Sequence, residues 1–189
     1  MEIKIRMATT ADAREISHCK IEGWQAGYRG IVPDSVLDLL DVGVEAERRR
    51  SYLEDPTSEV INLVALKDHE IVGWLAFGPH RDPDLMPGGY EEIYSLYVLP
   101  THWRSGVGHK LMQHTLDIFV EAKRSSTSLW VLEENVSGRT FYERMGLRPD
   151  GTRKPIGIGE NRLVEVRYRI LLTGHDTASL PGRLDGKGS

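Results

Sequence analysis

Residues 92–110 read EIYSLYVLPTHWRSGVGHK, and they are the most informative part of the sequence. An apolar and aromatic run ends at Pro100, a short loop carries Gly106 and Gly108, and a helical pattern begins at once. Such a loop points unpaired backbone N–H groups at one place, where the helix dipole adds about half a positive charge. A glycine has no Cβ, so an anion can approach the backbone closely. The stretch therefore predicts a strand, a helix and a pyrophosphate site between them.

The two glycines, taken alone, are compatible with more than one kind of loop. A Walker phosphate loop closes with Gly-Lys-Ser/Thr, which is missing here. A dinucleotide-binding loop needs a third glycine and an acidic residue about 20 positions later. A tight turn that binds no ligand accounts for the glycines as well as a phosphate site does.

A second segment follows at residues 135–147, which read NVSGRTFYERMGL. The two segments, in this order, resemble the GNAT superfamily of N-acetyltransferases. The resemblance rests on the strand before Pro100, on Gly106 and Gly108, and on the Asn, Phe-Tyr-Glu and Gly of the second segment. Trp103 stands where the family pattern has Gln or Arg, a departure that removes one side-chain contact and leaves the backbone amides in place. The looser resemblance extends over residues 3–171.

The resemblance implies acetyl-CoA as the acetyl donor, held where two parallel strands diverge. Those strands are residues 92–98 and 128–132. The implied cofactor contacts are the backbones of Leu96, Tyr97 and Val98, the loop residues Arg104, Ser105, Gly106, Val107, Gly108 and His109, and Asn135. The Val98 N–H is the implied donor to the tetrahedral oxyanion. A helix N-cap explains Asn135 equally well.

The resemblance also implies the catalytic groups. Tyr142 matches the tyrosine that protonates the departing CoA thiolate, with packing in the core as the alternative. Glu92 stands six residues before Val98, where related enzymes carry a Glu that accepts the amine proton; a solvated carboxylate or a water base stays open. Glu91 points to the opposite face of a strand, so at most one of the two faces the cleft. Trp130 replaces a Glu found in relatives that acetylate a ribosomal-protein N-terminus, which disfavours that substrate.

An amine acceptor is expected beside the first helices and the loop before the last strand. The candidate acceptor contacts are Trp24, Tyr28 and Arg29, together with residues 155–161. Helix packing explains the aromatic residues equally well. The segment 24–33 resembles bacterial acetyltransferases of amino acids and small amines, which favours a small acceptor.

The composition excludes several classes of protein. The 189 residues carry a net charge of −4, the wrong sign for a general nucleic-acid binder. The longest nearly apolar stretch, Ile71 to Pro79, is about half of the roughly 20 residues that a membrane helix needs. The start of the chain lacks the apolar core of a signal peptide. We therefore expect a cytoplasmic protein with neither nucleic acid nor membrane as a partner.

Neither cysteine nor histidine predicts a metal site. Cys19 is the single cysteine, so we expect a buried core residue, with no intrachain disulfide and no zinc site of the multi-Cys type. His102, His109 and His114 have no carboxylate or cysteine at ligand spacing.

Local patterns predict the remaining elements. Residues 3–7 alternate as a strand and lead through a capping box at Thr9–Asp12 into a helix. The other predicted elements are a glycine-broken segment from Gly23, a helix from Pro33 that continues through Glu45–Arg50, a hairpin of 61–66 and 71–77, a helix over 106–123, and a last strand over 163–171 with Glu165, Arg167 and Arg169 on a solvated face. Together they predict an α+β fold.

The patterns and the resemblance give one expected architecture and activity. The architecture is an α/β/α sandwich around a mixed, mostly antiparallel sheet of about six to seven strands with a splayed parallel pair. Residues 1–172 are expected to form a single domain, followed by a flexible tail over 173–189. We expect an acetyl-CoA-dependent N-acetyltransferase that acts on a primary amine, a small molecule, by direct attack in a ternary complex. The resemblance also implies a homodimer.

Two alternatives to this activity stay open. One is a catalytically silent acyl-CoA sensor, and the other is an acetyltransferase of protein N-termini or lysines. No motif identifies the amine acceptor or shows that acetyl is the sole acyl group.

Overall fold

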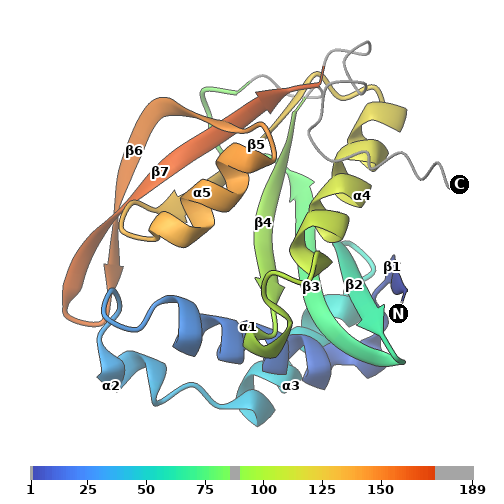
Figure 1. Ribbon diagram of the computed structural model, residues 1–189, viewed down its shortest axis with the longest axis vertical. Helices are drawn as coiled ribbons and strands as arrows, with labels where there is room; N and C mark the ends of the chain where they lie inside the picture. Colours follow the sequence, from blue (N-terminus) through green and yellow to red (C-terminus); the bar gives the residue numbers. More distant parts are fainter. Residues whose placement is uncertain (1, 86–89, 173–189) are drawn as a thin grey trace, which may run out of the picture.

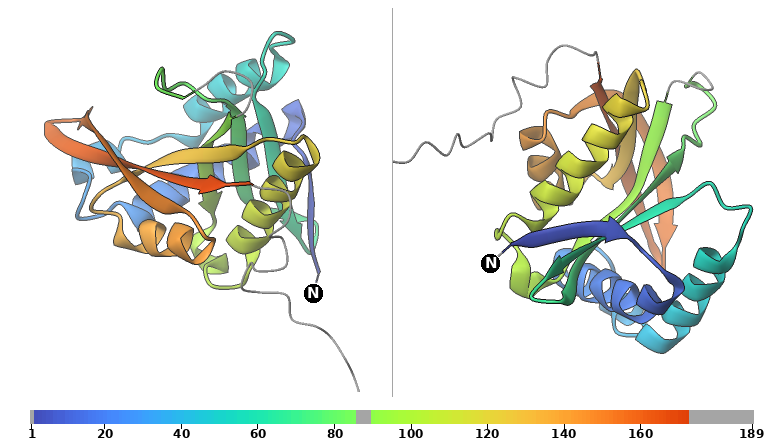
Figure 2. Two further views of the ribbon diagram at one scale, coloured as in Figure 1. Left: turned by 90° about the horizontal axis from the view of Figure 1, so that it is seen from above. Right: turned by 90° about the vertical axis from the view of Figure 1, so that its right-hand side faces the viewer.

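Seven strands form one mixed sheet with helices on both faces (Figures 1 and 2). The computed structural model describes residues 2–85 and 90–172, and the predicted tail over 173–189 lies outside them. The elements are β1 (Ile3–Met7), a 3-10 turn (Thr10–Asp12), α1 (Ala13–Gly27), α2 (Asp34–Leu37), α3 (Val42–Glu54), β2 (Ile61–Lys67), β3 (Glu70–Pro79), β4 (Tyr90–Val98), a second 3-10 turn (Pro100–His102), α4 (Val107–Glu121), β5 (Ser126–Leu132), α5 (Val136–Arg144), β6 (Arg148–Ile158) and β7 (Asn161–Leu171). The predicted sandwich is confirmed.

The strand order is β1-β2-β3-β4-β5-β7-β6. β4 and β5 pair in parallel, and the other neighbours pair antiparallel. The β2–β3 hairpin turns at Asp68 and His69, whose positive φ angles of 52° and 70° suit a tight two-residue turn. The predicted hairpin and the predicted parallel pair are both present.

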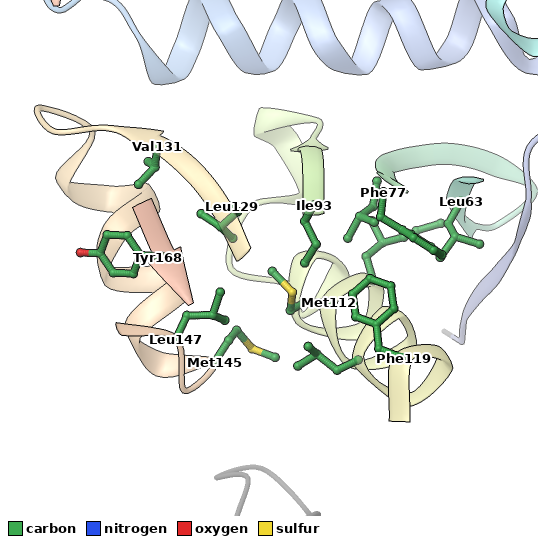
Figure 3. Close-up of a cluster of buried hydrophobic side chains, with 14 of the residues drawn as sticks. Leu63, Phe77, Ile93, Met112, Phe119, Leu129, Val131, Met145, Leu147 and Tyr168 are labelled. Carbon is green, nitrogen blue, oxygen red and sulfur yellow. The ribbon is translucent and has the colours of Figure 1, made fainter. Parts of the chain in front are cut away.

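Alternating side chains build a different core on each face of the sheet. On one face, Ile93 of β4 and Leu129 of β5 lie beside Met112 of α4 (Figure 3). On the other face, Trp74 of β3 packs with Ile16 of α1. The central strands are therefore covered on both sides, as their nearly continuous apolar runs require.

The segment from Gly23 to Gly27 continues α1 and does not break it, contrary to the sequence prediction. A Cβ on Gly23 would lie 3.1 Å from the ring of Tyr97, so this glycine lets α1 approach β4 closely. The helix predicted from Pro33 is also interrupted. It forms α2 and then α3, because Asp41 begins a new helix by accepting a hydrogen bond of 2.8 Å from the Val44 N–H.

β6 is a strand that the sequence analysis missed, since residues 155–161 were expected to lie in a loop. Pro149, Gly151, Pro155 and Gly157 interrupt its pattern. Prolines are tolerated here because β6 is the outer strand of the sheet and pairs on one side, with β7. The solvated face predicted for β7 is also wrong at Arg167, which is 2% exposed.

Candidate active site

β4 and β5 separate in the middle of the sheet. Their pairing runs from Tyr90 with Ser126 to Ile93 with Leu129 and stops there, although β4 continues to Val98. The β3–β4 register shifts at the same level, because Ala76 pairs with Ser95 while Phe77 pairs with Ile93. Tyr94 is therefore the extra residue of a β-bulge, and a bulge bends its strand. The bulge accounts for the gap that opens beyond Ile93.

The free edge of β4 presents main-chain groups to this gap. The Leu99 N–H donates to the Val72 carbonyl of β3 at 2.9 Å. Because hydrogen-bonded and non-bonded pairs alternate in an antiparallel ladder, the backbone of Tyr97 also faces β3, and those of Leu96 and Val98 face the gap. Of the three residues predicted to bind the cofactor through their backbones, two thus present free groups. Tyr97 does not.

The loop after β4 has the predicted form of an anion site. Gly106 precedes α4 with φ +88°, and no side chain caps the helix. The first intrahelical bond of α4 runs from the Lys110 N–H to the Gly106 carbonyl, which leaves the N–H groups of Val107, Gly108 and His109 without helical acceptors. Arg104 and Ser105 are exposed beside them, and the Ser105 hydroxyl donates to the His102 carbonyl at 2.7 Å.

Trp103 has a local role that the sequence did not indicate. Its indole N–H donates to the Val98 carbonyl at 2.8 Å. The residue that replaces the family's Gln or Arg thus ties the loop to the end of β4. This bond uses the Val98 carbonyl and leaves the Val98 N–H facing the gap.

Polar and aromatic side chains from three elements meet around the gap. The Trp24 indole N–H of α1 donates to the Tyr97 hydroxyl of β4 at 2.7 Å, and the Trp24 ring contacts that of Tyr28. Tyr97 and the Asn135 side chain lie close enough to the Tyr28 phenol to offset part of the rise in its pKa that burial causes. Asn135 also accepts from the Gly138 N–H at 2.9 Å, as the cap of α5. Four residues predicted for the site therefore lie together, and Asn135 does act as an N-cap.

Tyr142 of α5 lies close to the same group of phenols. Burial, and secondly the proximity of Tyr28, raises the pKa of Tyr142 above its ordinary value. Its ring also contacts Phe141, with centroids 5.4 Å apart. The phenol therefore stays protonated at neutral pH, which is the state that a proton donor needs.

Glu92 and Glu91 point to opposite faces of β4, as the strand period predicts. Glu91 pairs with Arg124 at 2.7 Å. Glu92 is 1% exposed, and Arg81 contacts it with its guanidinium at 2.5 Å and with its backbone N–H at 3.0 Å. Glu92 is thus a buried, ion-paired carboxylate and not the solvated strand-end group that the sequence left open.

A cavity of about 450 Å³ opens where the β4–β5 pairing ends. It is lined by Arg81, Asp82, Glu92, Ile93, Tyr94, Trp130, Lys154, Ile156 and Glu165. Several of these residues escaped the sequence analysis because they come from β6, β7 and the loop after β3. Charged residues in alternation on β7 were a usable signal, but the sequence alone did not distinguish a cavity wall from a solvated face.

Other predicted residues lie away from the gap or carry no chemistry in it. Arg29 is half exposed and pairs with Asp34 and Asp38 at 2.9 and 3.1 Å. Cys19 is fully buried. Burial, and secondly the nearby Glu15, raises the pKa of its thiol to about 12, so the thiol is inert as a nucleophile.

Within residues 2–85 and 90–172, no group of three or more His, Cys, Asp or Glu side chains is arranged to hold a metal ion. No helix in that part of the chain is long and apolar enough to cross a membrane.

Comparison with solved structures identifies the class of fold. PaiA N-acetyltransferase from Thermoplasma acidophilum, solved in complex with coenzyme A, is similar with a TM-score of 0.70 and 18% identity, over 88% of this chain and 98% of that one. YncA from Salmonella typhimurium, a putative acetyltransferase solved with acetyl-CoA, is similar with a TM-score of 0.66 and 19% identity, over 93% and 96%. The fold is that of the GNAT acetyltransferases.

Sequence comparison identifies the family. The pattern of the acetyltransferase (GNAT) family matches residues 26–147. A probable N-acetyltransferase of Mycobacterium tuberculosis is 29% identical over 175 residues, 89% of this chain and 93% of the relative. The N-acetyltransferase YuaI of Bacillus subtilis is 25% identical over 142 residues, 75% and 78% of the two chains. The chain belongs to the GNAT family, and it is an acetyltransferase.

Proposed function

We propose that this enzyme transfers the acetyl group of acetyl-CoA to the primary amine of a small molecule, by direct attack in a ternary complex. The position of the cavity supports the proposal. The cavity beside Ile93 and Tyr94 meets the free edge of β4 at the point where the parallel pairing ends. A donor lying along that edge and an acceptor in the cavity would then approach each other at the gap.

The main chain and α4 supply the proposed cofactor contacts. The free N–H groups at the start of α4 suit the pyrophosphate, since a helix N-terminus attracts anions. The backbone of Leu96 and the N–H of Val98 suit the amide groups of the pantetheine arm, which would pair with β4 like a short strand. Asn135, which the resemblance assigned to the cofactor, caps α5 at the gap.

The oxyanion contact is better assigned to Leu96 than to Val98. Both N–H groups face the gap, but Leu96 lies two residues nearer to the cavity lined by Ile93 and Tyr94. The acetyl carbonyl must lie close to the incoming amine, which is on that side. In a protease, the loss of one donor aimed at the developing oxyanion costs about 3 kcal/mol.

The reaction needs one proton acceptor and one proton donor. The amine nitrogen attacks the thioester carbon, the carbon–sulfur bond breaks, and the amine loses a proton. We propose that Glu92 accepts this proton, directly or through a water, because its carboxylate faces the cavity while that of Glu91 faces away. Tyr142 donates to the departing thiolate. The inert Cys19 supports attack without an acetyl-enzyme intermediate.

The size of the cavity favours a small acceptor over a protein. Small-molecule sites usually measure about 300 to 1,000 Å³, and this cavity lies within that range. A protein N-terminus or a lysine side chain is the alternative acceptor. Trp130, which lines the cavity, disfavours the ribosomal N-terminal substrate because it replaces the Glu of those relatives.

The test follows CoA thiol release with acetyl-CoA and pools of amino acids, polyamines, aminoglycosides and N-terminal peptides. Acetyl-CoA binding is measured separately by calorimetry. Release that depends on a small amine, and that falls in Tyr142→Phe, is the expected result. Binding without release from any pool would support the silent acyl-CoA sensor, and release from peptides alone would support a protein acceptor. The absence of both would refute the cofactor site.

We further propose that two copies pair through their last strands and that the enzyme acts in the cytoplasm. β6 is the outer strand of the sheet, and most of its odd-numbered side chains are exposed. An outer strand carries unpaired main-chain groups that a second copy can bond. The formal net charge of −4 makes nucleic acid a poor partner.

A further inference from the structure

The indole of Trp130 is held in a fixed orientation at the wall of the cavity. Its N–H donates to the Asp82 carboxylate at 3.0 and 3.3 Å. Asp82 accepts in turn from Arg167 at 3.1 Å, and Arg167 also pairs with Asp84 and Asp150 at 2.6 and 2.7 Å. Because Arg167 is almost fully buried, this arrangement fixes one face of the indole toward the cavity.

The Trp130 ring already lies beside two cations of the same chain. The Arg167 guanidinium lies 5.6 Å from the ring centroid. The Lys154 ammonium lies 3.8 Å from the ring centroid and 3.5 Å from the Glu165 carboxylate. An aromatic face beside a carboxylate is the arrangement that binds organic ammonium groups. Lys154 is 43% exposed on a flexible side chain, so it can leave this place without unfolding the strand.

Each carboxylate that lines the cavity has a cationic partner. Glu92 pairs with Arg81, Glu165 with Lys154, and Asp82 with the buried Arg167. Arg81 is held by Glu92, whereas Lys154 touches Glu165 at a longer distance. When the Lys154 side chain moves away, Glu165 loses its partner, and the Trp130 ring keeps the more distant Arg167 guanidinium and loses the nearer cation.

We propose that Trp130 and Glu165 form a binding site for a second cationic group of the acceptor, and that Lys154 occupies this site until such an acceptor displaces it. The inference rests on the proposed function and narrows the acceptor to diamines, polyamines and other amines with a second positive charge. The reacting amine would lie toward Glu92 and β4. The other ammonium would lie over Trp130.

Three acceptors with the same four-carbon chain test the second charge. Putrescine carries a second ammonium, butylamine carries none, and γ-aminobutyrate carries a carboxylate. We expect KM for putrescine to lie at least about fivefold below that for butylamine, with kcat changing little. Equal KM values for putrescine and butylamine, or a preference for γ-aminobutyrate, would overturn the inference, since the latter would mean that Lys154 and Arg81 bind an anion.

Two neighbouring variants test the role of Lys154. Lys154→Ala removes the internal cation and should lower KM for putrescine about threefold or more. Arg153→Ala removes the same charge one residue away on β6, where the side chain pairs with Glu133 at 2.5 Å outside the cavity. It should leave KM for putrescine within about twofold of the original value. Equal effects of the two variants would indicate general electrostatics and contradict the site.

Trp130→Leu and Glu165→Gln complete the test. Each should raise KM for putrescine at least about fivefold more than it raises KM for butylamine, and thermal melting checks that both variants fold. The cation site and the proposed function fail in different ways. Turnover of butylamine and putrescine with equal KM refutes this site alone, whereas acetyl-CoA binding without turnover of any amine refutes the proposed function.

Discussion

Gly106 and Gly108 lie two residues apart in the same loop, but the backbone demands glycine at only one of them. Gly106 has φ +88°, a conformation that residues with a Cβ rarely adopt. Gly108 is helical, and an added Cβ would meet Phe141 at 3.6 Å and Val98 at 3.7 Å, which are ordinary contacts. The backbone conformation at residue 106 therefore requires glycine, whereas residue 108 has room for a Cβ.

Gly106→Ala should therefore cost more than Gly108→Ala. The left-handed backbone costs an alanine about 1 to 2 kcal/mol, whereas an alanine inside a helix gains up to about 1 kcal/mol over glycine. We expect urea unfolding to show a loss for Gly106→Ala and no loss for Gly108→Ala. Calorimetry should show weaker acetyl-CoA binding for Gly106→Ala. Equal losses of stability would contradict the different backbone demands at the two glycines.

Tyr142→Phe tests the proposed proton donor. We expect kcat to fall about a hundredfold, while acetyl-CoA binding stays within about twofold. The pKa of Tyr142 is raised, so the phenol stays protonated through neutral pH and its deprotonation should limit the rate only above about pH 10. A pH–rate profile checks this. A fall in kcat between pH 7 and 9 that vanishes in Tyr142→Phe would contradict it.

At the scale of elements, the junction of β1 and α1 depends on one carboxylate. Asp12 accepts from Arg6 at 2.6 and 2.9 Å and from the Thr9 N–H at 2.7 Å. The Arg6 contact, and then the Thr9 contacts, lower the pKa of Asp12 to about 2 against the cost of burial. The predicted capping box is thus present, with an arginine added to it that the sequence did not indicate.

Asp12→Ala should destabilise the protein by about 1 to 2 kcal/mol at neutral pH. A carboxylate whose pKa is lowered by folding stabilises the folded state above its unfolded pKa of about 3.9. That contribution is lost as the pH falls through about 2. Urea unfolding of both proteins between pH 7 and pH 2 should show the difference shrink below about pH 4. A difference that stays constant would contradict the ionic origin.

β7 is tied to the loop after β3 through Arg167. Arg167→Met should cost about 3 kcal/mol, because a buried arginine is lost and the partly buried carboxylates of Asp82 and Asp150 lose their cation. Arg162→Met changes an exposed position on the same strand and should stay within about 0.5 kcal/mol. Thermal or urea unfolding compares the two. Similar small effects would mean that Arg167 does not hold the loop.

Across the whole molecule, the sequence predicts the features that depend on neighbouring residues and misses those that depend on contacts between distant segments of the chain. The strand, loop and helix of residues 92–110 follow from their own pattern, as does the hairpin of β2 and β3. The bulge at Tyr94 depends on register with β3, and the burial of Arg167 depends on three carboxylates far away in the chain. Neither leaves a local pattern. β6 was missed because its prolines are acceptable only at a sheet edge.

Sedimentation equilibrium tests the proposed pairing of two copies. We expect a species of twice 21.3 kDa at micromolar concentrations. Arg153→Pro changes a residue inside β6 and should shift the equilibrium toward the monomer if that strand forms the contact. A single species of 21.3 kDa throughout the concentration range would refute the pairing.

The open edge of β4 also affects how many substitutions the sequence can accumulate without losing this edge. Leu96 presents its main-chain donor and acceptor there and Val98 presents its donor, and every residue except proline carries both groups. Point mutations along the edge therefore change its lining but not its hydrogen-bonding pattern. The edge keeps its shape as long as the sequence preserves the bulge, the glycine before α4 and the strand that supports β4. The two solved neighbours described above keep the same fold at 18 and 19% identity, a degree of divergence that such a backbone-built edge tolerates.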